Sequence, residues 1–246
     1  MATSRVVIGT GAGQAAGRLN WLGRQLARHW AIGASCLLVA YVGLPLLAPA
    51  LMEVRWTGPA RVIYAIYSTQ CHQLPQRSFF LFGQQAMYPL PVIQAAWRHT
   101  TDPTVLRQFI GSPQMGWKVA WSDRMVAMYG SMALFSLAWA VRRPRIRPLP
   151  WWGALLLMAP LAVDGTTHLI SDVLSGFGAD GFRDTNAWLA YLTRSTLPAS
   201  FYAGDALGSF NSWMRLISGV LLGLGVVWFV FPYLQRLLDD SGRRAE

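Results

Sequence analysis

The segment Cys71-His72-Gln73-Leu74-Pro75-Gln76-Arg77-Ser78-Phe79-Phe80 holds a thiol, an imidazole, an amide and a guanidinium within seven residues, and it ends in two aromatic rings. A thiol can act as a nucleophile when a neighbouring cation lowers its pKa. Here His72 or Arg77 would have that role for Cys71. The segment therefore marks a candidate site, and nucleophilic catalysis is one chemistry open to it.

Metal binding is a second chemistry that these residue types allow. Cys71, His72, Asp164 and His168 offer thiolate, imidazole and carboxylate ligands that suit zinc or iron. Adjacent Cys and His side chains rarely bind one ion together, so at most three of the four are expected to do so. The chain has no Cys-x-x-Cys and no His-x-x-x-His pair.

The composition indicates an integral membrane protein. Hydrophobic residues make up 53% of the 246 residues and charged residues 13%, with twelve Trp. In such a protein, polar groups need water, a partner or a ligand, because desolvating them without partners is costly. The net charge of +10 does not indicate nucleic-acid binding, since the arginines lie beside apolar segments and accompany no nucleic-acid motif.

Four apolar stretches are long enough to cross a bilayer, which predicts an all-α integral membrane protein with about four transmembrane helices. We expect one membrane domain over residues 30–246, with spans near 30–52, 125–141, 151–172 and 213–234. The fourth stretch contains Gly219-x-x-x-Gly223, a spacing that permits close helix contact.

Arginine positions predict the orientation, because short basic loops stay on the cytoplasmic side. Arginines precede the first span, fill the link between the second and third spans and recur after the fourth. The sequence thus predicts a flexible cytoplasmic tail over residues 1–29 and both termini inside. The positions that carry this prediction are Arg5, Arg18, Arg24, Arg28, Arg142, Arg143, Arg145, Arg147, Arg236, Arg243 and Arg244.

Residues 53–124 then form a long region on the outer face that includes the motif. Tyr64 to Gly83 is too polar to span, and we expect an interfacial helix or a re-entrant segment there. Gln84 to Ala120, with four prolines, predicts a long loop with one short helix from Thr104 to Ile110.

The same orientation brings other polar groups to the depth of the motif. Asp123 and Arg124 begin the second span, and Arg215 lies near the start of the fourth. Asp164 and His168 are four residues apart, so they share one face in the outer half of the third span.

Several of these residues fall in motifs that resemble a known family. The family is a bacterial membrane-protein family, the domain of unknown function 2085. The matching motifs are CHQ-x-P-x-RSFF-x-x-G from Cys71, Arg124 with Tyr129-Gly130, RPLPWW from Arg147, DG-x-TH from Asp164, and N-x-x-x-R-x-x-SG-x-x-x-G from Asn211. The resemblance implies a small multi-span protein of the bacterial cytoplasmic (inner) membrane with a shared site on the outer face.

Two features depart from that family. Its second motif usually begins with Cys, and this chain has Ser122 at that position. The stretch between Gly83 and Trp121 is also longer than usual. If members of the family use two cysteines for a metal or a disulfide, this protein lacks half of that arrangement.

The predicted polar cluster, which is either ligand-binding or structural, consists of Cys71, His72, Gln73, Arg77, Asp123, Arg124, Asp164, His168 and Arg215. We expect Arg77, Arg124 and Asp164 to form its electrostatic core, with Arg124 paired to Asp164, and His72 and His168 to face a ligand.

The favoured function is an accessory or scaffold subunit of a larger membrane complex, because no complete catalytic set stands out. Its partners would be the lipid bilayer and other membrane protein subunits. Two alternatives stay open, a protein that binds a quinone or a lipid headgroup and a metal-dependent membrane enzyme. The corresponding cofactors would be a quinone, a lipid or a metal ion.

Overall fold

The structure, a computed structural model, describes residues 10–142, 146–176 and 181–244. Four helices in these ranges are long and apolar enough to cross a membrane, which confirms the predicted helical membrane fold with four spans. Their full bounds are α1 Thr10–Glu53, α5 Asp123–Arg142, α6 Trp151–Ser175 and α10 Phe210–Arg244. The shorter spans that hydropathy predicted lie inside these helices.

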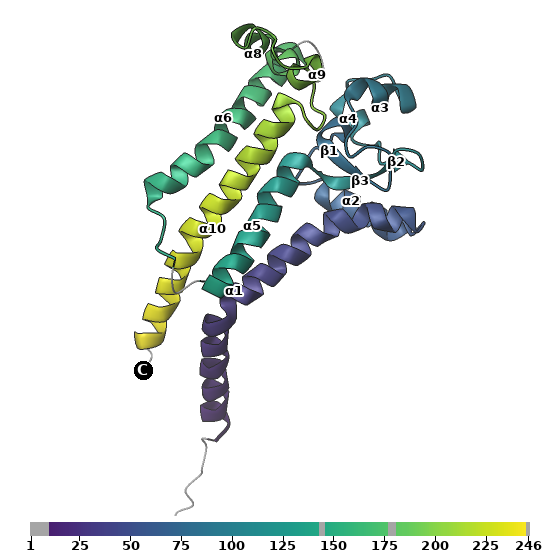
Figure 1. Ribbon diagram of the computed structural model, residues 1–246. Helices are drawn as coiled ribbons and strands as arrows, with labels where there is room; N and C mark the ends of the chain where they lie inside the picture. The colour runs from purple at the N-terminus through teal and green to yellow at the C-terminus, as the bar shows by residue number, and fades with distance from the viewer. Residues whose placement is uncertain (1–9, 143–145, 177–180, 245–246) are drawn as a thin grey trace, which may run out of the picture.

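The four long helices follow one another in the order α1, α5, α10, α6 (Figure 1). Helix α10 packs against both α5 and α6, while α1 packs mainly against α5. Small residues allow the closest of these contacts. A Cβ added to Gly219 would lie 2.9 Å from the Ala127 Cβ, and one added to Gly223 would lie 2.8 Å from the Met128 carbonyl oxygen. The Gly219-x-x-x-Gly223 spacing therefore marks the α5–α10 contact, as expected.

Helix α1 differs from the prediction at its N-terminal end. We expected residues 1–29 to form a flexible tail, but the helix begins at Thr10 and continues without a break into the span. Residues 10–29 include few strong helix breakers besides glycine, so the helical hydrogen bonding extends beyond the apolar stretch. Residues 1–9, including Arg5, and residues 143–145, including Arg143 and Arg145, lie outside the described residues.

The region after α1 contains a sheet that hydropathy did not reveal. After α2 (Thr57–Tyr67) and a single 3₁₀ turn at Pro75–Arg77, strands β1 (Ser78–Leu81), β2 (Gly111–Ser112) and β3 (Gly116–Ser122) form an antiparallel sheet in the order β1-β3-β2. Gln84 to Ala120 is therefore not a simple loop excursion. Prolines and glycines obscured strands this short in the sequence.

Strand β3 is buried because it packs beneath α1 and α2. Val119, Ala120 and Trp121 are fully buried there, and the Trp121 ring stacks on Tyr129 with centroids 5.0 Å apart. Ser122 pairs with Ser78 in the sheet, and β3 runs directly into α5 at Asp123. The sheet register thus places the end of the Cys71–Arg77 segment beside the start of α5.

The remaining elements are short. The helix expected at Thr104 to Ile110 is present as the single turn of α4, displaced towards its N-terminus. We expected an interfacial helix or a re-entrant segment from Tyr64 to Gly83. The helix in this region is α2, which ends at Tyr67 and so lies earlier in the chain than expected. The other short helices are α3 Leu90–Ala96, α4 Pro103–Leu106, α7 Phe182–Thr185, α8 Ala187–Leu192 and α9 Ala199–Tyr202.

Candidate functional site

A cavity of about 320 Å³ lies where the Cys71–Arg77 segment meets α5, α6 and α10. All of the predicted site residues except Asp123 and Asp164 line this cavity. These two carboxylates bind Arg215 and Arg124, respectively, and both arginines line the cavity. The sheet and the short helices surround this end of the long helices (Figure 1). The lining residues are Gln70, Cys71, His72, Gln73, Leu74, Arg77, Ser122, Arg124, Met125, Gly165, His168, Leu169, Asp172 and Arg215.

One chain of ion pairs ties α10 to α5 and to the motif. Arg215 Nε donates to both carboxylate oxygens of Asp123, at 2.9 Å each, and its Nη1 donates to Asp205 Oδ1 at 2.6 Å. The other oxygen of Asp205 accepts from Arg77 Nε at 2.7 Å. Arg77 Nη1 also lies 3.6 Å from Asp172 Oδ2 on α6. Asp205 therefore joins the arginine of the motif to the arginine of α10.

Charges determine the protonation of Asp205 and Arg77. Burial alone would raise the pKa of the Asp205 carboxyl, but Arg77 and Arg215 together lower it well below its ordinary value. Burial acts to lower the pKa of Arg77, and the carboxylates of Asp205 and Asp172 more than reverse this and raise it. Both groups are therefore charged at neutral pH.

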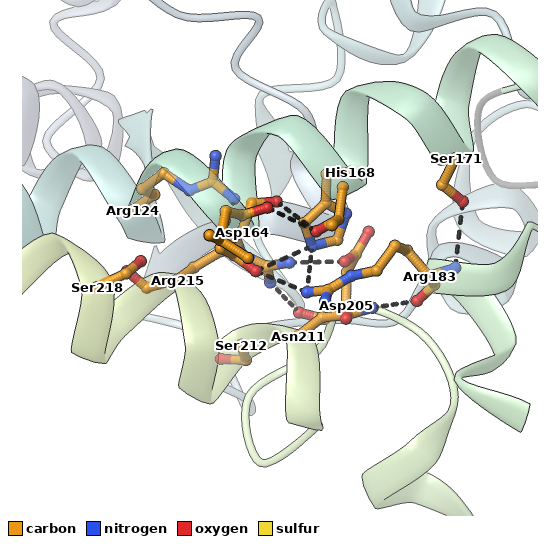
Figure 2. Close-up of polar contacts among 12 residues, drawn as sticks. Arg124, Asp164, His168, Ser171, Arg183, Asp205, Asn211, Ser212, Arg215 and Ser218 are labelled. Carbon is orange, nitrogen blue, oxygen red and sulfur yellow. Dashed lines mark hydrogen bonds and ion pairs between the residues drawn. The ribbon is translucent and has the colours of Figure 1, made fainter. Parts of the chain in front are cut away.

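A second group of contacts surrounds Asp164 on α6, as Figure 2 shows. Arg124 Nη2 donates to Asp164 Oδ2 at 2.6 Å, the pair that the sequence led us to expect. Arg183 Nη2 donates to the other oxygen, also at 2.6 Å. One buried carboxylate thus joins the start of α5 to α6 and to α7.

His168 has a tautomer that its neighbours fix. Its Nε2 lies 3.1 Å from Arg183 Nη2, and because a guanidinium can only donate, Nε2 must be the accepting, unprotonated nitrogen. The ring proton is then on Nδ1. His168 is 95% buried and it lines the cavity, and among the described residues Nδ1 has no hydrogen-bond partner. Arg124, in the same lining, has a buried Nε that also lacks a partner in the described part of the chain. Two donors of the site therefore have no acceptor among the residues that the structure describes.

Gln73 is a structural residue of the motif. Its side-chain Nε2 donates to the carbonyl oxygens of Tyr64 at 3.0 Å and Ala120 at 2.9 Å, which fixes the motif to α2 and β3. Its backbone has a φ of 51°, in the left-handed region that non-glycine residues seldom adopt. Its carbonyl oxygen accepts from Lys118 Nζ at 2.8 Å.

Cys71 and His72 lie at the wall between two hollows. Cys71 is a half-buried free thiol whose Sγ accepts from the Gln73 amide at 3.4 Å, and His72 is exposed. Both line the main cavity and also a smaller one of about 180 Å³ beside Arg107. Among the described residues, no group of three or more His, Cys, Asp or Glu side chains could hold a metal ion. Asp164 binds two arginines, so these contacts do not form a metal site from Cys71, His72, Asp164 and His168.

Four charged residues of the site were absent from the predicted cluster. Asp172 is four residues beyond His168, so extending the helical face of Asp164 and His168 by one turn would have found it. Arg183, Asp184 and Asp205 come from the segment between α6 and α10, where no periodic pattern gives a signal. Burial and the nearby Asp205 raise the pKa of Asp184 to about 6.

Sequence comparison agrees with this architecture. Residues 114–229 match the profile of the family described as "Predicted membrane protein (DUF2085)". This part of the chain is similar to that family. The matched residues include α5, α6 and most of α10, and with them Asp123, Arg124, Asp164, His168 and Arg215.

A curated relative covers more of the chain. The "Uncharacterized protein MJ1492" of Methanocaldococcus jannaschii is 25% identical over 183 residues, which is 72% of this chain and 71% of the relative. No solved structure matches the chain. The comparisons therefore support a multi-pass membrane protein that is similar to the DUF2085 family, and they add no reaction to it.

Proposed function

We propose that this protein binds the oxygen-bearing headgroup of a lipid-soluble molecule, a lipid or a quinone, in the cavity beside the Cys71–Arg77 segment. One observation carries the proposal: His168 lines that cavity, and its Nδ1–H is a buried donor with no acceptor among the described residues. A buried donor without a partner costs free energy, and a carbonyl or phosphate oxygen of a ligand would remove that cost.

The charge balance of the site supports a headgroup with little or no net charge. Four arginines and four aspartates contact one another there, so no large excess of positive charge is left for a free anion. The eight residues are Arg77, Arg124, Arg183, Arg215, Asp123, Asp164, Asp172 and Asp205.

The remaining lining supports an apolar tail. Leu74, Met125 and Leu169 line the same cavity, and Leu169 is 62% exposed on the face of α6. Helices α5 and α6 are candidate spans, so the lipid phase adjoins this part of the wall. The expected ligand therefore combines an oxygen acceptor with a hydrocarbon chain.

Extraction of the purified protein tests this proposal. After purification in a mild detergent, mass spectrometry of the organic extract should find a lipid or quinone species whose recovery depends on His168. His168→Gln should lose it, because a Gln side-chain oxygen can replace Nε2 but leaves no donor at the Nδ1 position. His168→Asn should retain it, because the Asn amide can donate from about the Nδ1 position.

The opposite result would overturn the proposal. If His168→Gln and His168→Asn carry the same extractable molecules as the native protein, the Nδ1 donor does not bind a ligand. Recovery of a lipid would identify one source of the headgroup, and recovery of a quinone the other.

The helix arrangement favours a second, compatible function as an accessory subunit of a larger membrane complex. Helices α1 and α6 lie at the two edges of the row and each packs mainly against one neighbouring span. Native-membrane purification should then yield stoichiometric membrane partners. A chain that elutes alone at its own mass would count against a subunit role.

We further propose that the cavity lies on the outer face of the bacterial cytoplasmic membrane, with both termini inside, which the arginine distribution supports. Tyr191 is 85% exposed in α8 near the sheet end of the spans. In a chain with Cys36→Ala and Cys71→Ser, Tyr191→Cys should react with a membrane-impermeant maleimide in intact cells. Labelling only after cell lysis would reverse the orientation.

A further inference from the structure

A second hollow lies at the other end of the long helices from the cavity of the motif. It has a volume of about 280 Å³ and lies between the last turns of α5 and the middle of α10. Its lining is apolar apart from two indole N–H groups. The residues are Phe135, Ala138, Trp139, Ile146, Leu224, Val227 and Trp228.

The two tryptophans of this hollow differ in their hydrogen bonding. Trp228 Nε1 donates to the Arg147 carbonyl oxygen at 2.8 Å. Trp139 is only 3% exposed, and its Nε1 has no partner among the described residues. The ring of Trp139 packs against Trp30 and Phe231, each with its centroid 5.5 Å away. Packing therefore holds in place a tryptophan that lines the hollow and whose N–H has no acceptor in the described part of the chain.

The depth of the hollow indicates what fills it. Trp139 lies three residues before Arg142, the last residue of the candidate span Asp123–Arg142. The hollow thus opens on the bilayer near one surface, at the level where acyl chains meet their ester groups. Its volume is slightly below the range of about 300–1,000 Å³ typical of ligand pockets, so it takes part of a lipid and not a whole one.

Charge at the same end identifies the headgroup class. Arg142 and Arg147 are exposed, and they precede and follow Ile146, which lines the hollow. Exposed arginines at a membrane surface attract anionic headgroups, and a guanidinium binds phosphate oxygens well.

We propose that this hollow binds one acyl chain of an anionic phospholipid, whose ester carbonyl accepts a hydrogen bond from Trp139 Nε1 and whose phosphate lies near Arg142 and Arg147. The site is separate from the cavity of the motif, because none of the described residues lines both. A lipid bound in this hollow lies at the membrane surface opposite the cavity of the motif.

Native mass spectrometry tests this site. The protein is reconstituted in vesicles of equal phosphatidylglycerol and phosphatidylcholine and released into mild detergent. The native chain should retain phosphatidylglycerol preferentially, and Trp139→Phe should retain at least threefold less, because Phe preserves the ring and removes the donor. Ala138→Trp, at an exposed position of the lining, should fill the hollow and have the same effect.

Trp151→Phe is the matched control, because Trp151 is 67% exposed at the same end of the bundle and does not line the hollow. It should retain phosphatidylglycerol as the native chain does. If Trp139→Phe and Ala138→Trp both match this control, the hollow is not a lipid site. If the native chain retains the two phospholipids equally, the site does not prefer an anionic headgroup.

Discussion

The Nε–H of Arg215 donates to both carboxylate oxygens of Asp123, with each N···O distance at 2.9 Å. Arg215 is 2% exposed and Asp123 is fully buried, although both lie near the ends of spans. The pair joins α10 to the residue at which β3 becomes α5. Water does not solvate these charges, so Asp123 depends on Arg215, and Arg215 depends on Asp123 and Asp205.

Arg215→Gln should therefore destabilise the protein strongly. The change leaves Asp123 and Asp205 buried without their common partner, and breaking a buried pair in this way costs about 3–5 kcal/mol. The midpoint of thermal unfolding in detergent measures the effect. Arg236→Gln is the control, because Arg236 is exposed on the same helix. Equal midpoints for the two variants would contradict a structural role for the buried pair.

Gly223→Ala should separate α10 from α5. An added Cβ would overlap the Ser131 hydroxyl and lie 2.8 Å from the Met128 carbonyl oxygen, and overpacking of this kind costs about 1–3 kcal/mol. Gly130→Ala on α5 is a matched control, because nothing lies within 4 Å of its Cβ position. That variant should be neutral or slightly more stable, since Ala favours the helix. Unfolding midpoints that fall equally in both variants would exclude a contact-specific effect.

Because of Lys118, the free energy of unfolding should change with pH in the alkaline range. It is the single lysine of the chain, it is fully buried, and burial lowers the pKa of its ammonium group to about 7. Between about pH 7 and 10 the unfolded chain holds this proton and the folded chain does not, so the free energy of unfolding rises with pH. The slope for one proton is about 1.4 kcal/mol per pH unit.

Lys118→Met tests that relation. The variant should be less stable overall, because the carbonyl oxygens of Gln73 and Arg107 lose their donor, at 2.8 and 2.9 Å in the native chain. Its free energy of unfolding should also lack the rise that the native protein shows from about pH 7 to 10. If both proteins gain stability in parallel over this range, another group is responsible.

Asp184 should have the opposite effect at acidic pH. Burial and Asp205 raise the pKa of its carboxyl to about 6 in the folded chain, against about 4 when unfolded. Between these values the folded chain holds the proton and the unfolded chain has lost it, so stability falls as pH rises from about 4 to 6. Asp184→Asn keeps an oxygen that can accept from the Gly181 amide, which donates to Asp184 Oδ2 at 3.2 Å.

The comparison of Asp184→Asn with the native protein isolates this carboxyl. The unfolding midpoint of Asp184→Asn, relative to that of the native protein, should rise from about pH 4 to 6. Above this range the difference should stay constant. A difference that does not change with pH would show that Asp184 titrates as an ordinary exposed carboxyl.

The sequence by itself determined the features that depend on local composition. The four spans follow from runs of apolar residues, because each span must satisfy its own backbone and expose hydrocarbon to lipid. The pairing of Arg124 with Asp164 was also predictable, since both fall near the same membrane depth and neither can remain unpaired there. The Gly219-x-x-x-Gly223 spacing indicated that a close helix contact is possible there, and the structure shows that α5 is the partner helix.

Only the tertiary structure decided which loop residues complete the site. Asp205 and Arg183 join Arg77, Arg215 and Asp164 because the segment between α6 and α10 folds back over the ends of those helices. Nothing in the order of residues along such a segment determines which charges it brings together, since no repeat relates them. The sheet around Lys118 was hidden for a similar reason, because β1 and β3 pair across more than 30 residues and a short strand has no stability of its own.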